Sequence, residues 1–254
     1  MVSTTKTVGD LSTVTGTAKS DFIILTKSDS DSLNLLGGYD RLEMLGDGNT
    51  VSLSNIESIK GSTGVDLVTL ETTITGGAIN LAGDVDQLTF SDFGGTATVS
   101  NIESILGGAD TEYLIYGGQA NEDHADLGDG NDKILLGKFV NDLTIQNVET
   151  VNGSLLTDVI TIESDFTGGK IDLAAGNDKI QLGDFGNTSR FRRSSPRARS
   201  TSATASMCLI LAILPMSSAS RMLNRSSAAL QSIRSSCPVR LQQFLSIWKA
   251  ARTS

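Results

Sequence analysis

The chain has 254 residues, and its charge is divided unevenly along its length. All 29 Asp and Glu lie before residue 185 together with nine of the 20 Lys and Arg, so residues 1–189 carry 9 − 29 = −20 and residues 190–254 carry 11 − 0 = +11. The acidic part argues against nucleic-acid binding, because phosphate recognition needs a basic face. No apolar run approaches the roughly 20 residues that a membrane-spanning helix requires.

The break in charge also divides the composition. Residues 1–188 are predicted to form an acidic repeat domain, and residues 189–254 a Ser/Arg-rich basic tail. The tail alone contains the cysteines, the prolines and the tryptophan: Cys208, Cys237, Pro196, Pro215, Pro238 and Trp248. The acidic domain therefore has no disulfide, and a sizeable apolar core must hold it together.

A repeat of 46 residues runs through the acidic domain. The motif Asn-Ile/Val-Glu begins at Asn55, Asn101 and Asn147, which are 46 residues apart. Four aspartates keep the same spacing, as do the apolar residues two positions after them: Asp40, Asp86, Asp132 and Asp178, then Leu42, Leu88, Ile134 and Ile180. About four copies are present, and stacking them buries an apolar column that no copy buries alone.

Each copy contains five short runs in which apolar and polar residues alternate. In the second copy these runs are 54–59, 67–70, 78–81, 87–90 and 96–100. Such alternation indicates half-buried strands, and no helical periodicity is visible before residue 190. We predict an all-β fold, a right-handed parallel β-solenoid or β-roll in which each copy makes two coils of unequal length. An antiparallel β-sandwich is the alternative, because short strands with regular turns suit it too.

Acidic turns separate the predicted strands. The segment 127–136 combines two glycines with Asp129, Asn131 and Asp132 ahead of an alternating strand. Glycine permits a left-handed backbone, and Asp and Asn form hydrogen bonds within their own turn. A second turn type, at 61–69, departs at one position from the nonapeptide GGxGxDxUx, in which U is a large apolar residue. Weaker or shortened versions of this second turn carry Asp21, Asp110 and Asp158.

These turns resemble the haemolysin-type, or RTX, calcium-binding repeats of bacterial secreted proteins. The resemblance spans residues 16–185 and is closest at 128–134 and 176–180. In that family, glycine-rich turns of successive coils hold calcium between carboxylates and backbone carbonyls, in keeping with the six to eight oxygens that calcium prefers. The resemblance implies a set of calcium-binding positions: Asp40, Asp66, Asp84, Asp86, Gly128, Asp129, Gly130, Asn131, Asp132, Asp158, Gly176, Asn177 and Asp178. It also implies type I secretion and an extracellular or cell-surface location.

The motifs differ from the family pattern in two respects. They are separated rather than arranged in uninterrupted tandem, and some lack the family's glycines. Asp84 stands where the third copy has Gly130, and Ala174 stands where it has Gly128. The alternative interpretation is that Gly, Asp and Asn only form turns between strands.

Other polar residues of the repeat favour structural roles. The motif asparagines are expected to stack as a ladder or to begin turns. The glutamates two positions later are expected to line an exposed face: Glu57, Glu103 and Glu149. His124 is the only histidine and lies among acidic residues. A solvated imidazole is expected there, because a zinc or catalytic role needs partner residues that the sequence lacks.

Enzyme activity is not expected, although right-handed β-helices include polysaccharide lyases and hydrolases. Such sites need carboxylates with Arg or Lys converging on one groove. The repeat domain has one arginine, Arg41, and its carboxylates recur at equivalent repeat positions. The sequence therefore predicts a structural or binding module with no chemistry of its own.

The tail has the character of a shifted reading frame. With suitable synonymous codons, reading residues 221–229 one nucleotide earlier spells Asn-Val-Glu-Ser-Ile-Ile-Gly-Gly, which is close to the repeat motif at 101–108. Our hypothesis is a one-nucleotide frameshift near residues 187–189, after which the native protein continues with further repeats. Sequencing of the encoding DNA tests it.

Together these features predict a calcium-binding structural repeat segment of a bacterial secreted or cell-surface protein. Calcium would couple folding to binding, because the −20 chain repels itself without counter-ions. The expected partners are calcium ions, neighbouring repeats and cell-surface polysaccharide, with no nucleic acid and no transmembrane segment. The alternatives are a metal-independent adhesin or surface-layer β-solenoid and, with less support, a carbohydrate-active β-helix.

Overall fold

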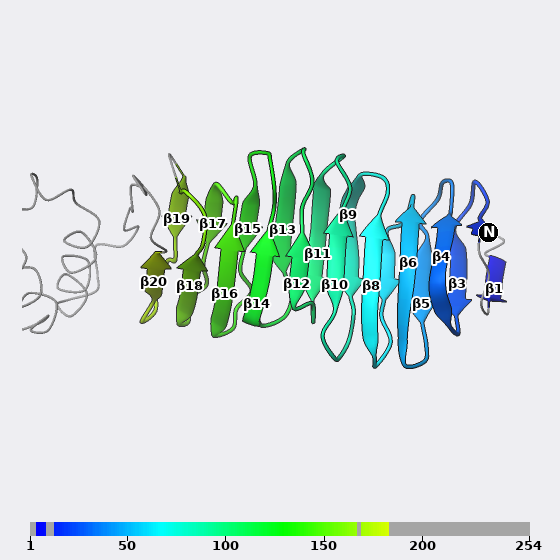
Figure 1. Ribbon diagram of the computed structural model, residues 1–254, viewed down its shortest axis with the longest axis horizontal. Coiled ribbons are helices and arrows are strands. Elements are labelled where there is room, and N and C mark those ends of the chain that lie inside the picture. Colours follow the sequence, from blue (N-terminus) through cyan, green and yellow to red (C-terminus); the bar gives the residue numbers. More distant parts are fainter. Residues whose placement is uncertain (1–3, 9–12, 167–168, 183–254) are drawn as a thin grey trace, which may run out of the picture. The chain divides into compact units, whose positions relative to one another are not determined.

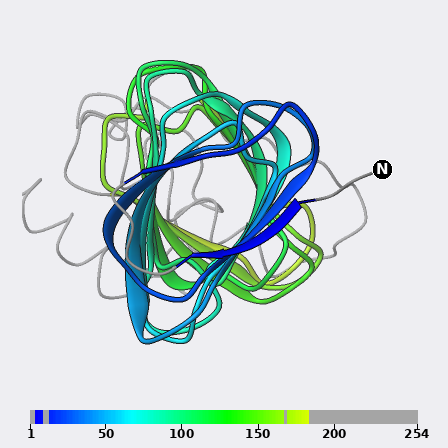
Figure 2. The same cartoon turned by 90° about the vertical axis from the view of Figure 1, so that its right-hand side faces the viewer.

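The computed structural model describes residues 4–8, 13–166 and 169–182, and these residues form strands, turns and loops with no helix among them. Twenty strands wind into a β-solenoid in which each coil contributes one strand to each of two sheets (Figure 1). Figure 2 looks along the stack, where the coils lie one behind another. The predicted boundary at residues 188 and 189, the frameshift and the cysteines of the tail lie outside the described residues.

The odd-numbered strands form one ten-stranded sheet, called here the odd sheet. In order, its strands are β1 (Thr4–Val8), β3 (Asp21–Leu25), β5 (Arg41–Met44), β7 (Ser58–Lys60), β9 (Ile74–Asn80), β11 (Gly95–Ser100), β13 (Glu112–Tyr116), β15 (Lys133–Leu135), β17 (Thr150–Asn152) and β19 (Lys170–Asp172).

The even-numbered strands form the second ten-stranded sheet, called here the even sheet. Its strands are β2 (Thr13–Thr15), β4 (Ser28–Asn34), β6 (Gly48–Ser54), β8 (Val65–Leu70), β10 (Gln87–Phe90), β12 (Ser104–Leu106), β14 (Asn121–Asp126), β16 (Asn141–Gln146), β18 (Asp158–Ile162) and β20 (Lys179–Leu182).

Neighbouring strands are parallel in both sheets, and each strand pairs with the strand one coil further along the chain. The predicted β-solenoid is therefore confirmed, and the antiparallel β-sandwich is excluded. Parallel pairing follows from the coil itself, because a chain that always turns the same way returns to each sheet in the same direction.

The core lies between the two sheets and runs along the described coils. Alternate residues point inward in strands such as β18, whose first, third and fifth residues are buried. The repeat-equivalent residues Leu42, Leu88 and Ile134 are fully buried, as the 46-residue spacing predicted. Each such side chain contributes about 1.5–3 kcal/mol of hydrophobic stabilisation, so the stacked column accounts for the apolar pattern of the repeat.

The 46-residue repeat spans five strands, or two and a half coils, rather than the predicted two coils. Asp40 and Asp132 directly precede β5 and β15 of the odd sheet, whereas Asp86 and Asp178 directly precede β10 and β20 of the even sheet. Because five is an odd number, successive copies place equivalent residues on opposite sheets. The prediction of two coils was wrong because residue spacing does not reveal how many strands pass between two equivalent positions.

Candidate functional site

The repeated acidic residues gather at the corners where the chain begins each strand. Three successive coils each supply one acidic residue, in the order Asp or Glu, Asp, Glu, and we call each such set a carboxylate ladder. The ladders are Asp21–Asp40–Glu57, Asp66–Asp86–Glu103, Glu112–Asp132–Glu149 and, within the described residues, Asp158–Asp178. They alternate between the odd and the even sheet, as the five-strand repeat requires.

Within a carboxylate ladder, the second and third carboxylates each accept a hydrogen bond from the backbone of the previous coil. The Glu112 N–H donates to Asp132 Oδ1 at 2.8 Å, and the Asp132 N–H donates to Glu149 Oε2 at 2.7 Å. The other ladders repeat these bonds, from Asp21 to Asp40, Asp40 to Glu57, Asp66 to Asp86, Asp86 to Glu103 and Asp158 to Asp178, at 2.7–3.0 Å. Buried backbone N–H groups need acceptors, so these side chains complete the hydrogen bonding of the strand starts.

The first member of a ladder is held by polar side chains around it. Asp66 Oδ2 accepts from the Ser62 N–H at 2.7 Å, and Asp66 Oδ1 accepts from Asn49 Nδ2 at 2.8 Å. Asp158 has the same environment, with bonds of 2.7 Å from the Ser154 N–H and from Asn141 Nδ2. These two buried carboxylates are therefore well supplied with donors.

Glu112 occupies the same place but lacks those donors. By the 46-residue spacing it corresponds to Asp66 and Asp158, while Gly95 and Gly108 replace the asparagine and the serine. Glu112 is fully buried, and neither carboxylate oxygen accepts a hydrogen bond. Burial, with the Asp132 carboxyl beside it, raises the pKa of Glu112 to about 8.

The middle aspartates also have raised pKa values. Burial is the largest cause for each, partly offset by the backbone N–H that each carboxylate accepts. The pKa of Asp86 rises to about 7 and that of Asp132 to about 6, while those of Asp40 and Asp178 rise as well. These four aspartates therefore hold protons more tightly than free aspartate does.

The predicted calcium positions divide between the inside and the outside of the coil. Asp40, Asp66, Asp86, Asp132 and Asp158 are buried in the ladders. Asp178, the remaining ladder position, is half-buried. The corner residues are exposed or half-buried: Asp84, Gly128, Asp129, Gly130, Asn131, Gly176 and Asn177. Two of the turn glycines lie beside the key aspartates, because a Cβ at Gly130 would be 2.7 Å from Asp132 Oδ1 and a Cβ at Gly176 under 3.0 Å from Asp178 Oδ1.

The Asp132 and Glu112 side chains offer three oxygens that accept no hydrogen bond, whereas calcium prefers six to eight oxygens, backbone carbonyls included. One Asp132 oxygen already accepts the Glu112 N–H, which leaves Asp132 Oδ2 and the two Glu112 oxygens without hydrogen-bond partners. Within the described residues, no group of three or more His, Cys, Asp or Glu side chains is arranged to hold a metal ion. Calcium binding therefore stays a prediction.

One corner position of every copy adopts a left-handed backbone. Gly128 has φ 74°, and its equivalents Leu36, Ala82 and Ala174 have φ 66°, 77° and 58°. The Ala82 N–H donates to Asn80 Oδ1 at 2.9 Å, which holds the turn although alanine disfavours this conformation. Glycine adopts this left-handed backbone most easily, but three of the four copies have leucine or alanine at this position.

We expect Ala82→Gly to raise the free energy of unfolding by about 1 kcal/mol, because it removes the left-handed strain of a Cβ. Gly128→Ala should lower it by at least as much, since its new Cβ would also meet the Gly108 carbonyl. Urea unfolding of both variants checks this. A destabilised Ala82→Gly protein would contradict the assignment of strain.

Sequence reasoning missed several of the structural residues. The shortened turn is predicted to carry Asp110 as its key acidic residue. By the 46-residue spacing, the residue equivalent to Asp66 and Asp158 is instead Glu112. The motif glutamates are half-buried and bind backbone N–H groups, so their expected exposed position was wrong. Asn55, Asn101 and Asn147 have a structural role as expected, with φ of 51–56° and side-chain bonds of 2.7–2.9 Å to the preceding coil.

Two further residues fall in β14. His124 lies on the outward face of that strand with a half-buried side chain, rather than in an acidic loop. Asp123 points inward beside a β-bulge, and burial raises its pKa to about 6. A carboxylate at an inward position breaks the apolar alternation, which is the sequence signal that could have revealed it.

No protein-family model, curated protein or solved structure matches this chain. In the part of the chain that the structure describes, no helix has the length and apolar character needed to cross a membrane. The fold and the carboxylate ladders define the chain as a parallel β-solenoid repeat protein.

Proposed function

We propose that this chain is a structural scaffold segment, a rigid β-solenoid that folds without metal ions and serves as a spacer in a bacterial secreted or cell-surface protein. The ladder hydrogen bonds carry this proposal. The carboxylates that would otherwise be metal ligands already accept backbone N–H groups from the neighbouring coil, and they do so in every copy.

Two other features support a scaffold. The core is continuous along the coils, so each copy is stabilised by its neighbours and the length of the array sets the length of the spacer. The carboxylates also recur at equivalent positions instead of converging on one irregular cleft, which is the arrangement that catalysis requires. The resemblance of the turns to haemolysin-type repeats supports the extracellular location.

Far-ultraviolet circular dichroism of the full chain tests the proposal. After treatment with EDTA, the β-sheet signal and the thermal midpoint should match those of the untreated protein. Addition of calcium or magnesium should shift the midpoint by less than about 2 °C. A chain that is disordered in EDTA and folds only with calcium would overturn the proposal and favour the calcium-coupled repeat.

A further inference from the structure

The outward face of the even sheet is uncharged over several coils, although the acidic part of the chain carries 9 − 29 = −20. The outward side chains of β6, β8 and β10 are Thr50, Ser52, Ser54, Val65, Leu67, Thr69, Gln87 and Thr89. The nearest charged residue in these columns is Asp29 of β4, and its carboxylate is paired with Lys27 Nζ at 2.9 Å.

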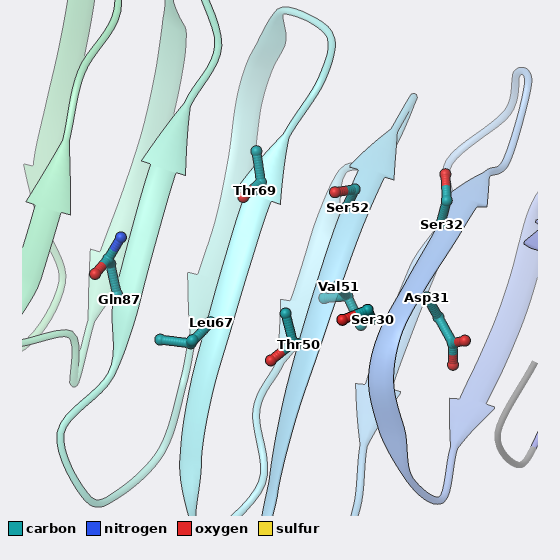
Figure 3. Close-up of a pocket in the computed structure, with 9 residues that line it drawn as sticks. All are labelled: Ser30, Asp31, Ser32, Thr50, Val51, Ser52, Leu67, Thr69 and Gln87. Carbon is teal, nitrogen blue, oxygen red and sulfur yellow. The ribbon is translucent and has the colours of Figure 1, made fainter. Parts of the chain in front are cut away.

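These side chains are in register from coil to coil. Thr50, Leu67 and Gln87 form one row, and a second row lies beside it, consisting of Ser32, Ser52, Thr69 and Thr89. Figure 3 shows the first row and, of the second row, Ser32, Ser52 and Thr69. Parallel strands are about 4.8 Å apart, so each row presents one hydrogen-bonding or apolar group at that interval along the solenoid.

The rows line a shallow groove on this face. Leu67, which is 42 % exposed, lines it together with hydroxyl and amide side chains. The lining also includes Asp31 of β4, whose side chain is buried. A second groove lies at the corner where the same coils leave the even sheet, lined by Asn55, Thr72, Thr73 and Phe93, whose ring is 60 % exposed. The two grooves lie on the same coils, and each is lined by both apolar and polar side chains.

The opposite side of the same coils is different. On the odd sheet, the adjacent strands β5 and β7 present Arg41, Glu43 and Lys60 outward, and Lys60 Nζ lies 2.6 Å from Glu43 Oε1. Charged residues thus occur at outward positions of β5 and β7, whereas β9 and β11 of the same sheet contain no charged residue.

We propose that this face, defined by Ser32, Thr50, Ser52, Leu67, Thr69, Gln87 and Thr89, binds a strand of neutral polysaccharide. Sugar units present hydroxyls that both donate and accept hydrogen bonds, and so do serine, threonine and glutamine. The C–H faces of the sugar rings pack on exposed apolar groups such as Leu67 and the Phe93 ring. The negative charge elsewhere on the domain disfavours acidic polymers.

The rigid sheet strengthens this assignment. A preformed array loses little conformational entropy on binding, and a polymer that contacts several coils at once gains from each of them. Glycan binding goes beyond the scaffold role and is tested separately from it, because a metal-independent fold says nothing about this face.

The test is native affinity electrophoresis of the full chain in gels that contain galactomannan, xyloglucan or β-1,3-glucan, with polygalacturonate as the acidic comparison. At least one neutral polymer should retard the protein, and polygalacturonate should not. Thr50→Glu should weaken the apparent affinity at least tenfold. Thr96→Glu is the matched control, because Thr96 is the 46-residue equivalent of Thr50 on the outward face of the odd sheet, and it should leave binding unchanged.

A second pair guards against misfolding of the first. Ser52→Glu should weaken binding, and its equivalent Thr98→Glu should not, with circular dichroism confirming the fold of each variant. Four results would overturn the proposal: no retardation by any of the three neutral polymers, equal retardation by polygalacturonate, equal losses in matched variants, or a self-association that Ser52→Glu abolishes without any glycan binding.

Discussion

Gly107→Ala should destabilise the solenoid by at least about 3 kcal/mol, the upper end for overpacking a core. A Cβ at this position would lie under 3.0 Å from three backbone atoms of Leu127 in the next coil. The Gly107 N–H also donates to the Asp126 carbonyl at 2.7 Å, so the two coils cannot separate without losing a hydrogen bond. Because strand spacing is set by the backbone bonds of the sheet, no side-chain movement relieves the clash.

Equilibrium urea unfolding measures this effect. Gly83→Ala is the matched control, because a Cβ there meets no atom within 4 Å, and it should change the free energy of unfolding by less than about 1 kcal/mol. Gly61 lies 46 residues before Gly107 and makes an equally close approach to the backbone of Leu81 in the next coil, so Gly61→Ala should behave as Gly107→Ala does. A Gly107→Ala protein as stable as the Gly83→Ala control would show that the coils adjust more easily than this geometry allows.

Glu112→Gln should stabilise the protein by about 2 kcal/mol at pH 8, in contrast to most substitutions of buried polar residues. The change removes a buried carboxyl that is about half ionised at this pH and lacks the asparagine donor that Asp66 and Asp158 each have. The new amide can also donate toward Asp132 Oδ2, which is itself buried without a partner. Thermal and urea unfolding of the variant measure the gain.

Asp158→Asn is the matched control for Glu112→Gln. Asp158 is the equivalent residue one copy later, and its oxygens already accept from Asn141 Nδ2 and from the Ser154 N–H. An amide nitrogen there would face a donor, so we expect a loss of about 1–3 kcal/mol. If both variants shift stability in the same direction, the missing donors around Glu112 do not explain its behaviour.

The stability of the native protein should fall as the pH rises from about 5 to about 8. Burial raises the folded-state pKa of Glu112 from its ordinary value of 4.5 to about 8, so the folded state binds this proton more tightly than the unfolded chain does. The resulting stability is fully present below the ordinary value and is lost as the pH passes through about 8. Asp86 and Asp132, with pKa values of about 7 and 6, act in the same direction.

A series of unfolding curves between pH 5 and pH 8.5 checks this dependence. Glu112→Gln should lose much of the slope above pH 7, because Glu112 is the group with the highest of these raised values. A native protein whose stability rises over the same range would contradict the assignment, since carboxylates stabilised in their charged form give that opposite sign.

The sequence by itself determined the repeat, the strands and the apolar core. A 46-residue spacing with alternating apolar residues places Leu42, Leu88 and Ile134 inside, because side chains of a strand point alternately to its two faces. The same spacing identifies Asp40, Asp86, Asp132 and Asp178 as equivalent positions of the repeat, for which the resemblance implies calcium binding.

Only the tertiary structure decided what those aspartates contact. Their partners are backbone N–H groups about 17–20 residues away in the neighbouring coil, and sequence spacing does not show which groups two coils bring together. Because each copy contains five strands, an odd number, Asp86 and Asp132 lie on opposite sheets. Glu112 lacks the donors of its equivalents because Gly95 and Gly108 stand where the other copies have asparagine and serine. The type and spacing of the residues therefore predict the β-strands and the apolar core. The packing of one coil on the next determines which hydrogen bonds the acidic corner residues form.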